Sequence, residues 1–169
     1  MMLDVERVLS ETSNYDEESV FKSLQPLGRE YTVFYADDSS VARKQIELTL
    51  TALGLRGMSA VNGRAAWEDL ERIADQAERS GRKVWEIVHL ILTDVEMPEM
   101  DGYILTKKIK SDTRFDGVPV LMHSSLSSMS NQTLGKSVGV DGYVPKFEPG
   151  RLADAIRSML VPEAAPIAA

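Results

Sequence analysis

The chain has 169 residues, about the length of one average domain, with 43% hydrophobic and 27% charged residues. No apolar run approaches the roughly 20 residues that span a bilayer, so the sequence predicts a soluble globular protein without membrane insertion. The net charge of −7 argues against nucleic-acid binding, and the absence of cysteine excludes disulfides and thiol chemistry. The N-terminus shows no signal peptide, which makes the cytoplasm the expected location.

Residues 1–30 form a leader with a composition unlike the rest of the chain. The leader opens on a short apolar set, Leu3, Val5, Val8 and Leu9, which predicts a remnant of a helix or strand. An acidic stretch and then Gln25-Pro-Leu-Gly28 follow, and this composition is typical of a solvated linker. At the other end, residues 161–169 are expected to be a disordered tail.

Between residues 31 and 160, short apolar runs alternate with longer amphipathic ones, which predicts strands and helices in turn. The expected strands are 31–36, 56–61, 87–93, 118–123 and 140–144. Three of them are apolar at nearly every position, as strands buried on both faces of a parallel sheet are. Right-handed helical connections then give an α/β fold, a doubly wound parallel sheet that binds ligands beyond the carboxyl ends of its strands.

Chemically active side chains follow four of these strands. Asp37 and Asp38 come directly after the first strand and Asp94 after the third, while Ser124 follows the fourth and Lys146 the fifth. Each has an ordinary structural explanation, such as a helix cap, a turn or a solvated lysine. Because the carboxyl ends of parallel strands meet at one edge, their coincidence there instead favours a functional site.

Three carboxylates in one cleft would repel each other by about 3 kcal/mol per pair at roughly 5 Å and an effective dielectric constant near 20. Lys146 supplies one compensating charge. A hard divalent cation with oxygen ligands would supply the rest, and Mg²⁺ fits a site with few protein ligands. The remaining coordination positions of Mg²⁺, together with a hydroxyl and an ammonium group, suit a phosphoryl group.

These residues, with the stretch Asp94-Val-Glu-Met-Pro-Glu-Met-Asp-Gly102, resemble the receiver domain of two-component response regulators over residues 31–160. The resemblance implies a flavodoxin-like sheet of strand order 2-1-3-4-5. It implies that Asp94 accepts a phosphoryl group from a histidine kinase, and that Lys146 and Ser124 bind the phosphoryl oxygens. By the same resemblance, Tyr143 occupies an aromatic switch position, and the Mg²⁺ ligands are Asp37, Asp38, Asp94 and the backbone carbonyl of Glu96.

The loop around Lys146 departs from the family pattern. Receivers usually place proline after this lysine, whereas here Pro145 precedes it and Phe147 follows. The reach of the lysine toward the carboxylates therefore has to be established from the structure.

Two features resemble the receiver half of a CheV-type chemotaxis protein. Asp38 and Asp94 are 56 positions apart, and the excess length falls in an extended second helix around residues 74–85. The segment 2–9 resembles the end of a CheW-like coupling module, although an ordinary capping helix explains it almost as well. The resemblance implies a CheA-like kinase as one partner and a chemoreceptor array, bound through a missing CheW-like module, as another.

The favoured function is a phosphorylation-dependent switch in chemotaxis, which catalyses only its own phosphorylation and slow dephosphorylation. One alternative is a Mg²⁺-dependent phosphohydrolase with an aspartate nucleophile, since Glu96 stands two residues after Asp94, where such enzymes need an acid or base. Another is the receiver of a transcriptional response regulator cut at its linker. Four remaining side chains are assigned structural roles: His89 and His123 as hydrogen-bonded histidines, and Trp67 and Trp85 as core residues.

Overall fold

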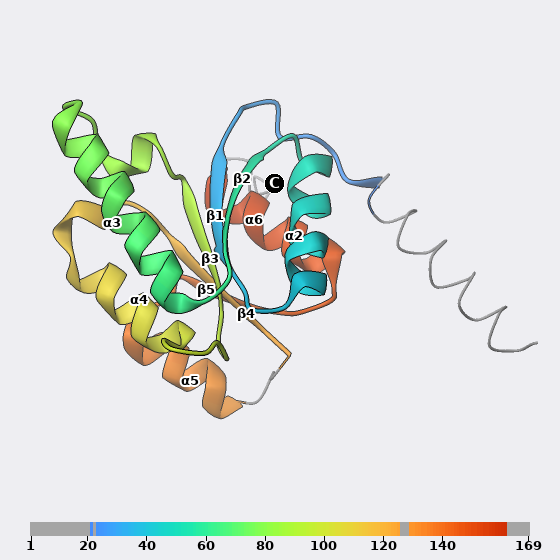
Figure 1. The fold of residues 1–169 in the computed structure, drawn as a ribbon. Coiled ribbons are helices and arrows are strands. Elements are labelled where there is room, and N and C mark those ends of the chain that lie inside the picture. The colour runs from blue at the N-terminus through green and yellow to red at the C-terminus, as the bar shows by residue number, and fades with distance from the viewer. Residues whose placement is uncertain (1–20, 22, 126–128, 162–169) are drawn as a thin grey trace, which may run out of the picture.

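The protein is a five-stranded parallel sheet with helices on both faces, as the computed structural model shows (Figure 1). The structure describes residues 21, 23–125 and 129–161. The strand order is β2-β1-β3-β4-β5, which confirms the expected fold class and order. The strands are β1 (Thr32–Ala36), β2 (Arg56–Ala60), β3 (Leu90–Asp94), β4 (Val120–Ser124) and β5 (Gly142–Pro145).

The helices divide into two layers. In Figure 1, α2 and α6 lie on one side of the sheet, and α3, α4 and α5 lie on the other. None of the helices formed by the described residues is long and apolar enough to cross a membrane. Their bounds are α2 (Ser40–Ala52), α3 (Gly63–Arg79), α4 (Gly102–Ser111), α5 (Met129–Val138) and α6 (Pro149–Leu160), with 3-10 turns η1 (Val84–Glu86) and η2 (Thr113–Phe115).

The sheet separates two hydrophobic clusters, which explains why its central strands are apolar at successive positions. In β1, Phe34 and Ala36 pack into the cluster shared with α3 and α4, whereas Val33 and Tyr35 pack into the cluster beneath α2 and α6. All five residues of β3 and of β4 are buried. The edge strand β2 is exposed at four of its five positions, so its apolar pattern is weaker.

Polar side chains fix where three helices begin, at the end of the molecule that carries the carboxyl ends of the strands. The Ser39 hydroxyl accepts a hydrogen bond from the Ala42 N–H at the start of α2. The Asn62 side chain accepts one from Ala65 N at the start of α3, and the Asp101 carboxylate accepts one from Ile104 N at the start of α4. These caps satisfy N–H groups that lack a partner within the helix.

The sequence predicts a strand from residue 87, whereas in the structure β3 begins only at Leu90, after turn η1. The helix α3 runs for 17 residues but ends at Arg79, so the expected extension around residues 74–85 is helical only in its first part, and turn η1 follows before β3 begins at Leu90. The Trp67 side chain packs against Phe115 with ring centroids 5.8 Å apart, as expected of a core residue. The core assignment of Trp85 is wrong, because that residue is 50% exposed.

The described end of the leader packs on the sheet domain, whereas its composition suggested a solvated linker. Leu24 and Leu27 are partly buried against the cluster beneath α2 and α6. The Leu27 N–H donates to the Leu53 carbonyl at 3.1 Å, and the Arg157 guanidinium donates to the Gln25 carbonyl at 2.7 Å. The expected apolar remnant at 3–9 and the tail from residue 162 lie outside the described residues.

Candidate functional site

Three aspartates converge where β1 and β3 end. Asp94 is the last residue of β3, and Asp37 and Asp38 follow β1 directly. Each offers a carboxylate oxygen, and these oxygens all lie within 4.8 Å of one another. Asp37 and Asp94 are buried while Asp38 is exposed, so the cluster has one solvent-facing side. The predicted gathering of carboxylates at this edge is confirmed.

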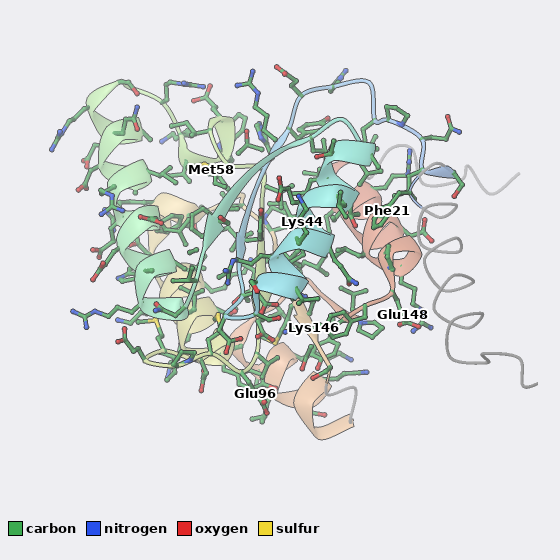
Figure 2. All side chains as sticks on the ribbon, turned by 45° about the vertical axis from the view of Figure 1, so that its right-hand side comes forward. Phe21, Lys44, Met58, Glu96, Lys146 and Glu148 are labelled. Atoms are coloured by element: carbon green, nitrogen blue, oxygen red, sulfur yellow. The ribbon has the colours of Figure 1, made fainter. Side chains whose placement is uncertain are left out.

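Lys146 reaches this cluster from the loop after β5. Its Nζ lies 2.9 Å from Asp37 Oδ2 and 3.0 Å from Asp94 Oδ2, and its side chain is only 10% exposed. The Lys146 N–H donates to the Ser124 carbonyl at 2.9 Å, which ties the loop to the end of β4. Figure 2 shows Lys146 at the same end of the molecule as Glu96. The lysine therefore reaches the carboxylates although no proline follows it.

Phe147 adopts an unusual backbone conformation beside this lysine. Its φ angle is 61°, in the left-handed region, and its side chain is 54% exposed. A residue with a Cβ atom pays about 1–2 kcal/mol for this conformation, whereas glycine adopts it without that steric cost. The loop thus holds local backbone strain next to the group that neutralises the two buried carboxylates.

We expect Phe147→Gly to raise the free energy of unfolding by about 1 kcal/mol, because the strain disappears while little buried contact is lost. Chemical denaturation of the two proteins measures this difference. The control is Phe147→Ala, which removes the ring but keeps the Cβ atom and should give no such gain. Equal stabilities of the glycine and alanine variants would show that the backbone conformation at this position carries no strain.

The environment of Asp94 disfavours its ionised form in the metal-free protein. Burial, and then the negative charge of Asp37, raise the pKa of Asp94 to about 6, although Lys146 opposes this shift. Burial alone would lower the pKa of Lys146, but hydrogen bonding and attraction to Asp37 and Asp94 outweigh it and raise this pKa. The site therefore holds more negative charge than one ammonium group compensates.

Asp94→Asn should accordingly stabilise the metal-free protein at about pH 8, by about 2 kcal/mol, and by much less at about pH 4. The pKa of Asp94 is higher folded than unfolded, so ionisation of this group lowers stability as the pH rises through about 6. Urea unfolding in the presence of a chelator measures both values. Asp38→Asn, at the exposed carboxylate, is the control and should change stability less. A gain that is the same at both pH values would contradict the explanation.

The remaining predicted residues lie around this cluster. Ser124 is buried at the end of β4, the strand that pairs with β3. Tyr143 is partly buried on β5. Glu96 is exposed in the loop after β3, where it lines an open groove of about 480 Å³ together with Asp38 and Tyr103. The structure thus brings Asp37, Asp38, Asp94 and Lys146 together, while the chemical roles of all seven residues stay predictions.

His123 also lies at the cluster, a position that its assignment as a structural histidine did not reveal. It pairs with Asp94 across the β3–β4 ladder, and its Nε2 is 3.4 Å from Asp37 Oδ2. Burial, and then the charge of Lys146, lower the pKa of His123 to about 3, so the ring is neutral at physiological pH. The signal in the sequence that could have predicted this placement is that His123 stands at the end of its expected strand, as the aspartates do at the ends of theirs.

The residues present fit a hard divalent cation. Three carboxylates lie close to one another and share the ammonium group of Lys146, which pairs with two of them. Oxygen ligands of this kind are those that Mg²⁺ prefers. A cation here would also offset the repulsion that raises the pKa of Asp94.

Comparison with known proteins identifies the family. The family model for the response regulator receiver domain matches residues 33–157. The chain belongs to the response regulator receiver family. Receiver domains bind Mg²⁺ at an acidic pocket, and this receiver has a cluster of three aspartates that could hold a metal ion. CheY-like receivers act as signalling switches rather than as conventional enzymes.

Several relatives of this receiver are chemotaxis proteins. It is 29% identical to the chemotaxis protein CheV3 of Helicobacter pylori over 160 residues, which cover 95% of this chain and 50% of CheV3. It is 33% identical to CheY1 of the same species over 126 residues, covering 73% of this chain and 92% of CheY1. The structure of Vibrio cholerae CheY4 matches it with a TM-score of 0.63 at 26% identity, covering 78% of this chain and all of that one. The receiver spans about half the length of its CheV relatives.

Proposed function

We propose that Asp94 accepts a phosphoryl group from a phosphohistidine on a histidine kinase and that the receiver thereby switches a chemotaxis signal. The observation that carries this proposal is the position of the Asp94 carboxylate, buried at a strand end, with the Lys146 ammonium 3.0 Å from its Oδ2. The proposed Mg²⁺ ligands are Asp37, Asp38, Asp94 and the backbone carbonyl of Glu96. Bound Mg²⁺ would neutralise charge that develops on the transferred group.

In the proposed transfer, an oxygen of Asp94 forms a bond to phosphorus while the bond between phosphorus and the kinase histidine nitrogen breaks. The electron pair of that bond stays on the nitrogen. Lys146, already beside Asp94, binds a phosphoryl oxygen, and the Ser124 hydroxyl donates to another. Tyr143 then changes its packing in response, which makes it the switch residue.

The chemotaxis relatives support the choice of partners. A CheA-like kinase is the proposed phosphoryl donor. The greater length of the CheV relatives leaves room for a coupling module, and we propose that a CheW-like module links this receiver to a chemoreceptor array. The proposed location is the cytoplasm, and neither nucleic acid nor membrane insertion has a part in this function.

The test is incubation of the protein with Mg²⁺ and acetyl phosphate, followed by intact-protein mass spectrometry. We expect one phosphoryl group per chain, none when a chelator removes the metal, and none in Asp94→Asn. The matched control is Asp154→Asn, at an exposed aspartate on α6, which should take up the group as wild type does. If Asp94→Asn takes up the phosphoryl group as wild type does, the assignment of Asp94 as the phosphoacceptor is refuted. Steady release of phosphate, many turnovers per chain, would favour the phosphohydrolase alternative.

A further inference from the structure

Two buried polar atoms face each other beside the phosphoacceptor. Asp37 Oδ2 and His123 Nε2 are 3.4 Å apart, and apart from the ion pair of Oδ2 with Lys146 neither atom has a well-aligned hydrogen bond within the described residues. Oδ2 also forms the ion pair with Lys146 Nζ at 2.9 Å, while the other oxygen, Oδ1, accepts the Ser39 N–H at 2.8 Å. Buried polar groups normally have partners, so this pair needs an explanation.

The contact with Asp37 decides whether Nε2 of His123 carries a hydrogen, because a carboxylate oxygen can only accept a hydrogen bond. A neutral imidazole has one N–H donor and one nitrogen with a lone pair. If Nε2 carried the lone pair, it would face a carboxylate oxygen in a buried site, and the two would repel each other. The arrangement is favourable only when Nε2 carries the hydrogen and donates it to Asp37 Oδ2.

Phosphorylation changes what Lys146 must neutralise. The ammonium group now bridges Asp37 and Asp94, with almost equal distances to the two carboxylates. A phosphoryl group on Asp94 brings about −1.5 to −2 charge, which draws the ammonium toward it and away from Asp37. The fully buried Oδ2 of Asp37 would then lose the ammonium group that holds it, so another donor is needed to keep this oxygen in place at the metal site.

We propose that His123 is a positioning residue for Asp37, whose Oδ2 it holds through Nε2–H so that Lys146 can turn to the phosphoryl group. This inference rests on the proposed function. In the unphosphorylated state His123 shares Oδ2 with the lysine, and in the phosphorylated state it becomes the main donor to that oxygen. The orientation of Asp37 in the metal site is thereby kept while the lysine changes partners.

The first experiment reads the hydrogen bond directly, without any phosphoryl chemistry. In nitrogen-15 NMR spectra of the imidazole at neutral pH, we expect His123 to be the Nε2–H tautomer, with a slowly exchanging proton. Asp37→Asn should shift that proton upfield, because the amide is a weaker acceptor than the carboxylate. The Nδ1–H tautomer, or a proton shift unaffected by Asp37→Asn, would overturn the inference.

The second experiment uses beryllium trifluoride with Mg²⁺ as a phosphoryl mimic. We expect the His123 Nε2–H resonance to move downfield on binding, as Lys146 leaves and the bond shortens. His123→Leu should bind the mimic about tenfold more weakly, the effect of losing one hydrogen bond to a charged group. His123→Gln retains an N–H donor and should restore most of the affinity. If the leucine variant binds the mimic as tightly as wild type does, the positioning role of His123 is refuted.

Several outcomes separate this inference from the proposed function. His123→Leu replaces the ring by an apolar side chain beside a cavity of about 20 Å³, and Lys146 still pairs with Asp37 Oδ2, so the variant should fold and lose at most the stability of one shared hydrogen bond. A mere packing role for His123 would make the leucine and glutamine variants behave alike, which would refute the positioning role. If wild type fails to bind the mimic at all, the proposed function falls, while the tautomer measurement still reports the contact between His123 and Asp37.

Discussion

Lys146→Met is expected to lower the free energy of unfolding of the metal-free protein by about 3–5 kcal/mol at about pH 8. The lysine is the cation that contacts both buried carboxylates, so its removal leaves Asp37 and Asp94 within the fold without compensation. Methionine keeps most of the apolar stem of the lysine. The loss of stability therefore measures the effect of removing the charge rather than the effect of changed packing. Urea denaturation with a chelator present measures it.

Two further conditions make this prediction specific. The loss should shrink at about pH 5, because Asp94, with its pKa raised to about 6, is then mostly protonated. Added Mg²⁺ should restore part of the stability by supplying the missing positive charge. Lys44→Met, at a side chain that is 64% exposed on α2, is the matched control and should change stability by less than about 0.5 kcal/mol. A loss at Lys146 that is independent of both pH and Mg²⁺ would contradict the electrostatic explanation.

Gly102→Ala is expected to destabilise the protein by about 3 kcal/mol, because there is no room for a side chain at the start of α4. A Cβ atom at this position would lie 1.9 Å from the backbone carbonyl oxygen of Asp94. The Gly102 N–H also donates to the Val95 carbonyl at 2.8 Å, so the helix cannot move away without losing that bond. The substitution should therefore also displace Asp94, the proposed phosphoacceptor, and slow its phosphorylation.

The control for this prediction is Gly150→Ala in α6. A Cβ atom there would meet nothing within 4 Å, and alanine favours helix over glycine, so stability should stay the same or rise. Thermal unfolding of both variants, with the rate of labelling by acetyl phosphate, provides the comparison. Similar effects of the two substitutions would show that the close approach between α4 and β3 is not what requires Gly102.

The sequence predicted the sheet and the carboxylate cluster because both depend on patterns along single strands. A buried parallel strand is apolar at successive positions, as β3 is, and the residue that ends it must lie at the ligand-binding edge. Asp37, Asp38 and Asp94 each follow from that argument. The strand order did not follow from it, since the 2-1-3-4-5 arrangement came from a family resemblance.

Features that depend on packing between distant segments were harder to predict. The left-handed backbone of Phe147, beside Lys146, is one example, because an aromatic residue gives no signal for this conformation. The role proposed for His123 depends on its register beside Asp94, which a single strand does not reveal. Trp85 is half exposed because it follows α3 in a turn, where helical periodicity no longer applies.

The packing of Leu24 and Leu27 bears on how a fragment of this protein should be cut. A fragment that begins at Tyr31, where the strand pattern starts, would lack the two leucines that pack against the cluster beneath α2 and α6. Apolar surface would then be exposed there. The fragment would also lack the Gln25 carbonyl, which accepts a hydrogen bond from the Arg157 guanidinium on α6. Such a fragment should self-associate more readily than one that begins before Leu24. Residues 25–27 are hydrogen-bonded at two places, to the Leu53 carbonyl after α2 and to the Arg157 guanidinium on α6, so a displacement of this segment would act first on these two elements.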